Sequence, residues 1–168
     1  VANHVSFVDA VSIMGAAPRP VRFVMDHRIF RIPVLSYVFR HCAAIPIAAA
    51  KEDPVLMEKA FAAVSTALAD GELVAIFPEG NITRDGELQP FRPGITRILA
   101  ANPVPVVPMA LSGLWGSFFS RVDGEAMKKP FRRGLFSRIT LRAGAPVAAA
   151  DASPETLQRR VAELRGAN

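Results

Sequence analysis

Strand-like segments alternate with helix-like segments along most of this chain, and this alternation restricts the fold more than any other feature. The clearest strand is the continuous apolar run at residues 73–77, which is typical of a strand buried on both faces. The clearest helix follows the cap Asp53-Pro54 and ends at Asp70-Gly71, with apolar residues at helical spacing between them. The pattern predicts an α/β fold with a mainly parallel, mixed sheet flanked by helices.

Further strands and helices are predicted before and after these two segments. Strands are expected at residues 21–25, 43–48, 104–111 and 139–142, and helices at residues 5–17, 33–40, 94–101 and from 154 onward. Pro46 cannot donate to a ladder, so its strand should be an edge strand or end there.

The length of 168 residues fits one domain, spanning residues 1–168. The chain opens at Val1 without an initiator methionine, so we expect a piece of a longer multidomain protein that lacks its N-terminal segment. The single Cys42 cannot form an intrachain disulfide, which favours a cytoplasmic setting. His27 and His41 lack the spacing of metal ligands, so no metal site is expected.

The composition favours a protein that lies on a membrane surface. Hydrophobic residues make up 51% of the chain and the mean hydropathy is +0.26, yet no run of 18 apolar residues occurs. The formal net charge of +5 equals the excess within residues 121–142, where seven cations face two carboxylates. Such a basic segment can attract anionic lipid headgroups or the phosphates of a cofactor or carrier protein, and no nucleic-acid motif accompanies it.

Aromatic residues are interleaved with cations from Gly113 to Arg133, a pattern that suits the interface of an anionic membrane. The same stretch also fits a solvated basic loop around one or two buried aromatic side chains. From the sequence the two interpretations carry similar weight.

A possible catalytic pair lies at the start of the chain, in Asn3-His4 and Asp9. An imidazole can take a proton from an attacking hydroxyl, and a carboxylate on its other nitrogen stabilises the imidazolium that forms. A regular helix would hold the two side chains about 140° apart, so His4 must precede the helix and Asp9 must reach back to it. Spacing alone favours a simpler interpretation, in which His4 caps a helix and Asp9 is a surface residue.

A second stretch, Phe77-Pro78-Glu79-Gly80, changes that balance. With the Asn-His-x4-Asp stretch and the later Val106-Val107-Pro108-Met109, it resembles the blocks of the glycerolipid acyltransferases related to 1-acylglycerol-3-phosphate acyltransferase. The resemblance covers nearly the whole chain, and it implies the fold of that family.

The resemblance implies transfer of a fatty acyl group from a thioester, on coenzyme A or acyl carrier protein, to a lipid hydroxyl. His4 and Asp9 would be the catalytic base and its partner, with no acyl-enzyme and no bound cofactor. Phe77, Pro78, Glu79, Gly80 and Arg84 would form the acceptor site. We expect His4 to face Asp9 and to look across a cleft toward Glu79.

Two departures from the family pattern bear on the acceptor. Ile82 stands where family members that bind a bare phosphate often have arginine, and Ala49 stands where the second block ends in arginine. Losing two guanidinium contacts weakens the binding of a phosphate dianion. A lysophospholipid with an esterified phosphate is therefore the favoured acceptor, with 1-acylglycerol 3-phosphate or glycerol 3-phosphate as the alternative. Arg84 remains for a phosphodiester contact, although it also fits an ordinary loop arginine.

Other classes of function stay open. A noncatalytic lipid- or carrier-binding module could keep the fold and the basic surface, although it has no need of the base His4. A hydrolase that uses water instead of the acceptor is a third option. We expect the protein on the cytoplasmic side of a membrane, either peripheral or tethered through a longer parent; the sequence does not determine its oligomeric state.

Overall fold

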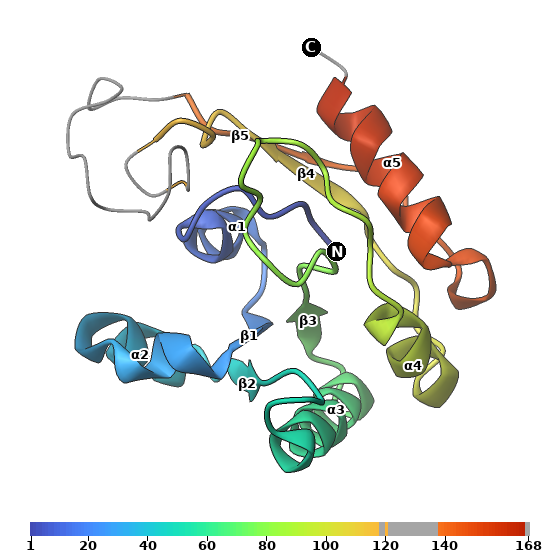
Figure 1. Ribbon diagram of the computed structural model, residues 1–168. Coiled ribbons are helices and arrows are strands. Elements are labelled where there is room, and N and C mark those ends of the chain that lie inside the picture. The colour runs from blue at the N-terminus through green and yellow to red at the C-terminus, as the bar shows by residue number, and fades with distance from the viewer. Residues whose placement is uncertain (118–119, 121–137, 167–168) are drawn as a thin grey trace. The chain divides into compact units, whose positions relative to one another are not determined.

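The computed structural model describes residues 1–117, 120 and 138–166, which form two compact units (Figure 1). The parallel-sheet unit comprises Ala17–Ile76 and Ile98–Val104. The site unit comprises Val1–Ala16, Phe77–Arg97 and the described part of Pro105–Asn168. Both candidate motifs therefore belong to the site unit.

The parallel-sheet unit is built from three strands joined by helical crossovers. Its strands are β1 (Val21–Asp26), β2 (Ile45–Ile47) and β3 (Leu73–Ala75), all parallel, in the order β2-β1-β3. The 3-10 helix η1 (His27–Arg31) and helix α2 (Pro33–His41) connect β1 to β2, and helix α3 (Pro54–Ala69) connects β2 to β3. The crossover helices agree with the requirement that parallel neighbours have long connections.

Local sequence explains where these helices begin and end. Asp26 caps η1 by accepting a hydrogen bond from the amide of Arg28 at 2.8 Å. Asp53 caps α3 in the same way through the amide of Leu56 at 2.8 Å, with Pro54 in the first turn. Gly71 follows the end of α3 with φ of 73°, a conformation that favours glycine. The predicted caps of α3 are confirmed.

Apolar side chains between the sheet and α3 form the core of this unit. Ile45 from β2 and Ala60 and Val64 from α3 are buried together. Partly buried apolar residues pack around them, namely Val24, Ile47, Ala63, Leu68, Val74 and Ile98. As expected from Pro46, β2 is an edge strand of this sheet.

The site unit holds a second, antiparallel pair of strands. Strand β4 (Met109–Ser112) pairs with β5 (Thr140–Ala143), and helix α5 (Pro154–Gly166) packs against them (Figure 1). On α5, Leu157 and Val161 are fully buried, as their helical spacing predicts. The unit also contains helix α1 (Asp9–Ala16), the first turn of α4 (Gly94–Ala101) and the 3-10 helix η2 (Ala149–Asp151).

The chain start runs beside β4 in the site unit. Ala2 forms an isolated parallel bridge with Met109, whose amide donates to the carbonyl of Val1 at 2.8 Å. The backbone nitrogen of Val1 donates to the carbonyl of Val107 at 2.9 Å. The residues before His4 are thus held by backbone hydrogen bonds to Val107 and Met109.

Four predicted elements are shorter than expected, and one of them is the strand at residues 43–48, which comprises only Ile45–Ile47. The strand at residues 73–77 ends at Ala75, and the expectation that it is buried on both faces is wrong, because Leu73 is 39% exposed and only Ala75 is buried. The strand at 104–111 is a ladder only from Met109, since Pro105 and Pro108 have no amide to donate. The first helix begins at Asp9 rather than residue 5.

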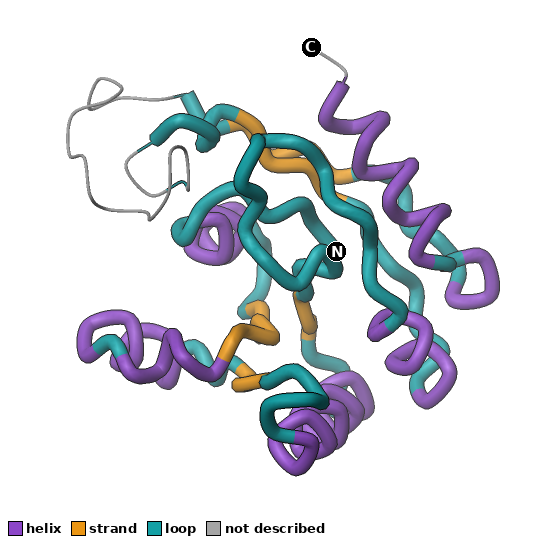
Figure 2. Tube along the Cα trace, in the orientation of Figure 1, coloured by secondary structure: helices purple, strands orange, loops and turns teal. Residues whose placement is uncertain are grey.

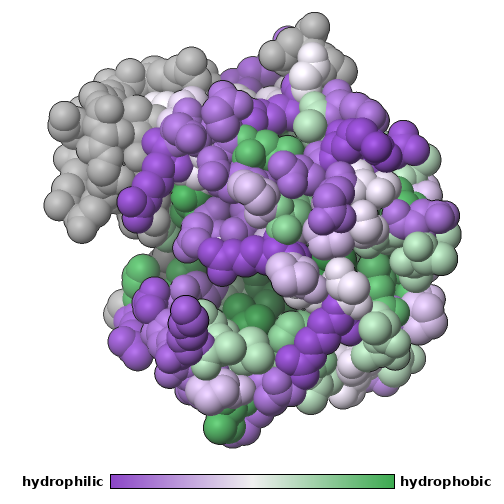
Figure 3. Space-filling view, turned by 45° about the vertical axis from the view of Figure 1, so that its right-hand side comes forward, coloured by the Kyte–Doolittle hydropathy of each residue, from purple (hydrophilic) through white to green (hydrophobic). Residues whose placement is uncertain are grey.

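The α/β class with a mixed strand arrangement is confirmed. A long loop, residues 76–93, joins β3 to α4 and carries the whole second motif (Figure 2). Among the described residues, no helix combines the length and apolar character needed to span a bilayer. On the face shown in Figure 3, apolar areas are interspersed with polar ones. Most of the basic segment at 121–142 lies outside the described residues, which include Arg138 and Arg142.

Candidate active site

Asn3 anchors the first motif to the antiparallel strands. Its side chain is 1% exposed, donates to the carbonyl of Leu111 at 3.0 Å and accepts from the amide of Leu111 at 2.7 Å. An amide side chain can satisfy both groups of one peptide unit, because it carries a donor and an acceptor side by side. The asparagine of the motif therefore positions His4 by fixing the backbone beside it.

The carboxylate of Asp9 shapes the turn that carries His4. Its Oδ2 accepts from the amides of Val5 and Ser6 at 2.7 and 2.8 Å, and Asp9 itself is buried. These bonds hold residues 4–8 as a loop that turns into α1, which is why the helix begins at Asp9. The other oxygen, Oδ1, is buried without a hydrogen-bond partner among the described residues.

His4 and Asp9 meet as the motif spacing requires. Nδ1 of His4 lies 2.9 Å from Oδ2 of Asp9. Oδ2 of Asp9 already accepts hydrogen bonds from two backbone amides, and as a carboxylate oxygen it can only accept from His4 as well. We therefore assign the proton of the neutral imidazole to Nδ1, which leaves the lone pair on Nε2. The predicted loop-to-helix junction and the facing pair are both present.

Phe77 fixes the plane of the imidazole. The two rings stack with centroids 4.1 Å apart and an interplanar angle of 8°. The side chain of His4 is 18% exposed, and no described residue hydrogen bonds to Nε2. The arrangement leaves this basic nitrogen available to a substrate hydroxyl.

Glu79 holds the backbone of His4 from the second motif. The carboxylate is 4% exposed; Oε1 accepts from the amide of His4 at 2.6 Å and Oε2 from the amide of Gln89 at 2.7 Å. The expected cleft between His4 and Glu79 is therefore wrong, because the two are in direct contact. The predicted role of Glu79 in holding the acceptor stays a prediction.

Burial raises the pKa of Glu79 to about 7. The hydrogen bonds from the amides of Gln89 and His4 oppose this effect, as does the positive charge of Arg165. A carboxyl group that changes its charge near neutral pH thus contacts the backbone of His4 directly.

The second motif is a tight turn. The amide of Gly80 donates to the carbonyl of Phe77 at 3.0 Å, and Gly80 has φ of 72°. The carbonyl of Pro78 accepts from the amide of Arg92 at 2.9 Å, and the amide of Thr83 donates to the carbonyl of His4 at 2.9 Å. The peptide groups on both sides of the His4 side chain are consequently held by the loop at 76–93.

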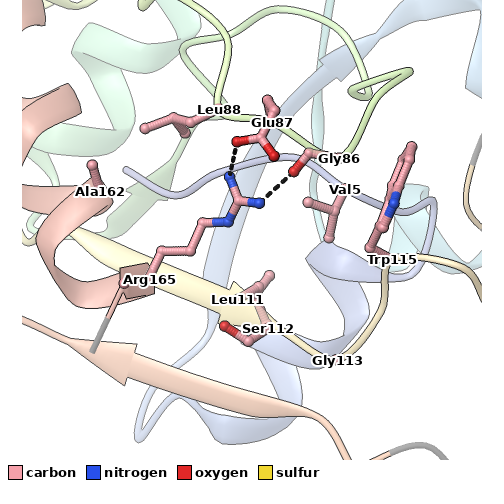
Figure 4. Close-up of a pocket in the computed structure, with 11 residues that line it drawn as sticks. Val5, Gly86, Glu87, Leu88, Leu111, Ser112, Gly113, Trp115, Ala162 and Arg165 are labelled. Carbon is pink, nitrogen blue, oxygen red and sulfur yellow. Dashed lines mark hydrogen bonds and ion pairs between the residues drawn. The ribbon is translucent and has the colours of Figure 1, made fainter. Parts of the chain in front are cut away.

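Two hollows lie in the site unit. One, of about 750 Å³, is lined by Glu79 and residues 81–85 and 89–93, and includes the predicted acceptor residue Arg84. The other, of about 510 Å³, includes Val5 and Trp115 (Figure 4). In that second pocket Arg165 reaches Glu87 at 3.7 Å and the carbonyl of Gly86.

The structure brings His4, Asp9, Phe77 and Glu79 together, whereas Arg84 is exposed on the first hollow. Sequence reasoning missed Gln89 and Arg92. Both follow the motif by about ten residues, within an irregular loop. Sequence spacing predicts contacts within helices and tight turns, but it does not predict how such a loop folds back onto the motif. No group of three or more potential metal ligands occurs among the described residues.

A histidine hydrogen bonded to a buried carboxylate on an α/β scaffold is an arrangement that can accept a proton from a hydroxyl group. The model of one protein family, described as Acyltransferase, matches residues 1–112. The chain belongs to this acyltransferase family.

Curated relatives agree with this assignment. The chain is 32% identical over 113 residues to "1-acyl-sn-glycerol-3-phosphate acyltransferase BAT2, chloroplastic" of Brassica napus, a match that covers 67% of this chain and 32% of that protein. It is 29% identical to the LPAT1 enzyme of the same name from Arabidopsis thaliana, over 67% of this chain and 31% of that one. The chain spans about a third of the length of these two plant relatives.

A bacterial relative and a solved structure extend the match over almost the whole chain. The 1-acyl-sn-glycerol-3-phosphate acyltransferase of Bacillus subtilis is 24% identical over 96% of this chain and 78% of its own length. The crystal structure of the 1-acyl-sn-glycerophosphate (LPA) acyltransferase PlsC from Thermotoga maritima superposes with a TM-score of 0.66 at 21% identity. It covers 97% of this chain and 61% of that one, which confirms the fold.

Proposed function

We propose that this chain catalyses transfer of a fatty acyl group from a thioester to the free hydroxyl of 1-acylglycerol 3-phosphate. The observation that carries the proposal is the His4–Asp9 pair at 2.9 Å, with Nε2 left for the acceptor. The acceptor is chosen because the relatives described above are named for it.

The reaction balances without a covalent enzyme intermediate. Nε2 of His4 takes the proton of the acceptor hydroxyl as its oxygen attacks the thioester carbonyl carbon. Asp9 stabilises the resulting imidazolium through Nδ1. The carbon–sulfur bond then breaks, and the imidazolium returns the proton to the departing thiolate. Coenzyme A and acyl carrier protein supply the same thioester, and we propose either as donor.

The lysophospholipid favoured by the sequence is the alternative acceptor. Its phosphate is a diester, which carries one charge where a phosphate monoester approaches two. Both acceptors and the acyl chain of the donor partition into bilayers, so we propose that the protein works at the cytoplasmic face of a membrane, as a peripheral or tethered protein.

A noncatalytic binding module is the competing class. It would be favoured by a His4 that turns away from Asp9, whereas the two side chains are hydrogen bonded. A binding module also has no use for a buried carboxylate that sets the tautomer of a histidine.

The test is acyl transfer by the longer parent protein. Labelled acyl thioesters are supplied with 1-acylglycerol 3-phosphate or lysophosphatidylcholine, and lipid products are separated. His4→Ala should lower kcat by about 100- to 10,000-fold, the range for loss of a general base. His41→Ala is the matched control, because His41 is exposed and bonds only to the carbonyl of Tyr37.

Thermal unfolding of each variant separates lost chemistry from lost folding. Full activity in a folded His4→Ala variant would refute the proposed base. Free fatty acid formed at the same rate without any acceptor would instead indicate a hydrolase.

A further inference from the structure

The guanidinium of Arg92 lies directly over Gly80 in the second motif. A Cβ atom added to Gly80 would be 2.7 Å from both Cζ and Nε of Arg92. Real Cβ atoms do not approach other atoms so closely, so the guanidinium occupies the space that only a glycine leaves open. Arg92, twelve positions beyond the end of the motif, is thereby placed on the motif itself.

Asn81 orients this guanidinium. With its amide oxygen turned toward Arg92, Asn81 accepts from Nη2 at 2.8 Å and donates to the carbonyl of Gly80 at 3.1 Å. The backbone of Arg92 is fixed by its amide, which donates to the carbonyl of Pro78 at 2.9 Å. The arginine is held at both ends beside the turn, although its residue is exposed to solvent.

The position where related sequences often carry arginine cannot supply a cation here. Ile82 is 7% exposed and packs into the protein. Two exposed arginines, Arg84 and Arg92, line the hollow of about 750 Å³ instead. Neither forms an ion pair with a carboxylate among the described residues, so the positive charge of each guanidinium is not neutralised within the hollow.

The two carboxylates that line the same hollow accept hydrogen bonds from backbone amides and neighbouring polar side chains rather than from these arginines. Glu79 accepts from two backbone amides, as described above. Oδ1 of Asp85 accepts from the hydroxyl of Thr83 at 2.7 Å, the amide of Glu87 at 2.9 Å and the side chain of Gln89 at 3.1 Å. These hydrogen bonds hold the pKa of Asp85 below its ordinary value.

We propose that Arg92, assisted by Arg84, binds the phosphate of the acceptor and thereby takes over the task of the arginine that is absent at position 82. The inference rests on the proposed function, and it concerns the specificity of that site. A planar guanidinium can bind two oxygens of a phosphate at once, which a lysine cannot. Paired arginines select a phosphate monoester over a diester, because the monoester offers more charge and one more free oxygen.

The first measurement is binding, which does not require turnover. Isothermal titration of the folded protein uses two soluble probes, hexanoyl lysophosphatidate and hexanoyl lysophosphatidylcholine, with glycerol 3-phosphate as a third arm for the headgroup alone. Arg92→Ala should weaken binding of the two monoesters by about 10- to 100-fold, the scale of a lost charge-assisted contact. It should change binding of the diester by less than about threefold, and Arg92→Lys should fall between wild type and Arg92→Ala.

The matched control is Arg159→Ala on α5, an exposed arginine outside the hollow, which should leave all three affinities unchanged. In the transfer assay, Arg92→Ala should raise KM for 1-acylglycerol 3-phosphate much more than it lowers kcat. A structural role would instead reduce kcat for both acceptors equally.

The outcomes separate this inference from the proposed function. Wild-type acyl transfer together with an unchanged KM in Arg92→Ala overturns the phosphate site and leaves the function intact. Monoester binding that depends on Arg92, without any acyl transfer by the wild type, supports the phosphate site and overturns the function. Equal losses for monoester and diester would refute the claim that Arg92 selects between them.

Discussion

Replacing Asp9 tests the central geometry of the site, because one oxygen of this side chain serves both folding and chemistry. Oδ2 accepts from the amides of Val5 and Ser6 and from Nδ1 of His4, all between 2.7 and 2.9 Å. Alanine removes the acceptor and leaves two buried amides without a partner. Asparagine keeps an acceptor oxygen but removes the charge.

The expected costs follow from these contacts. An unsatisfied buried amide costs about 1–3 kcal/mol, so Asp9→Ala should lower the free energy of unfolding by about 2–6 kcal/mol. Domains of this size are stable by about 5–15 kcal/mol, so this loss is a large fraction of the total stability. Asp9→Asn should lose about 1–3 kcal/mol, because its new amino group replaces Oδ1, which has no hydrogen-bond partner to offer.

Catalysis should show a different order of effects. Without the carboxylate, the imidazolium formed during proton transfer loses its stabilising charge, so folded Asp9→Asn should lose about 100- to 10,000-fold in kcat. Urea unfolding followed by fluorescence of Trp115 measures stability, and the acyl-transfer assay measures kcat. Wild-type stability in Asp9→Ala would refute the role of Oδ2 in the turn, and wild-type kcat in Asp9→Asn would refute its role toward His4.

Two further predictions concern the groups that hold the site. Asn3→Ala should lower the free energy of unfolding by about 2–4 kcal/mol in urea titrations, since it leaves both the amide and the carbonyl of Leu111 unpaired; an unchanged midpoint would contradict the anchoring role. Glu79 should make unfolding depend on pH. The pKa of Glu79 is about 7 in the folded protein and 4.5 in the unfolded chain, so between pH 4.5 and pH 7 the folded state binds a proton that the unfolded state has lost. The free energy of unfolding therefore falls by roughly 2–3 kcal/mol as the pH rises from 4.5 to 7. Glu79→Gln should lack this slope, and an identical slope in both proteins would show that another group causes it.

Local patterns in the sequence determined a large part of the molecule. The caps around α3 and the proline at the start of α2 could be predicted because capping is a contact between residues two to four positions apart. The meeting of His4 with Asp9 was predicted from the resemblance of their motif to the acyltransferase family, because the spacing alone favours a surface position for Asp9. The alternation of strands and helices likewise predicted an α/β fold.

Long-range contacts required the tertiary structure. The ladder of β4 begins only after Pro108, and its partner β5 is antiparallel, which the pattern of apolar residues does not reveal. The direct bond between Glu79 and the amide of His4 replaced the expected cleft.

The sequence by itself identified the candidate catalytic residues, because His4, Asp9 and the stretch Phe77–Gly80 match short motifs. Only the tertiary structure decided what surrounds them. The loop at 76–93 has no regular hydrogen-bond pattern, so its path depends on packing and not on spacing. That path places Arg92 over Gly80, where a cation is available although position 82 carries isoleucine.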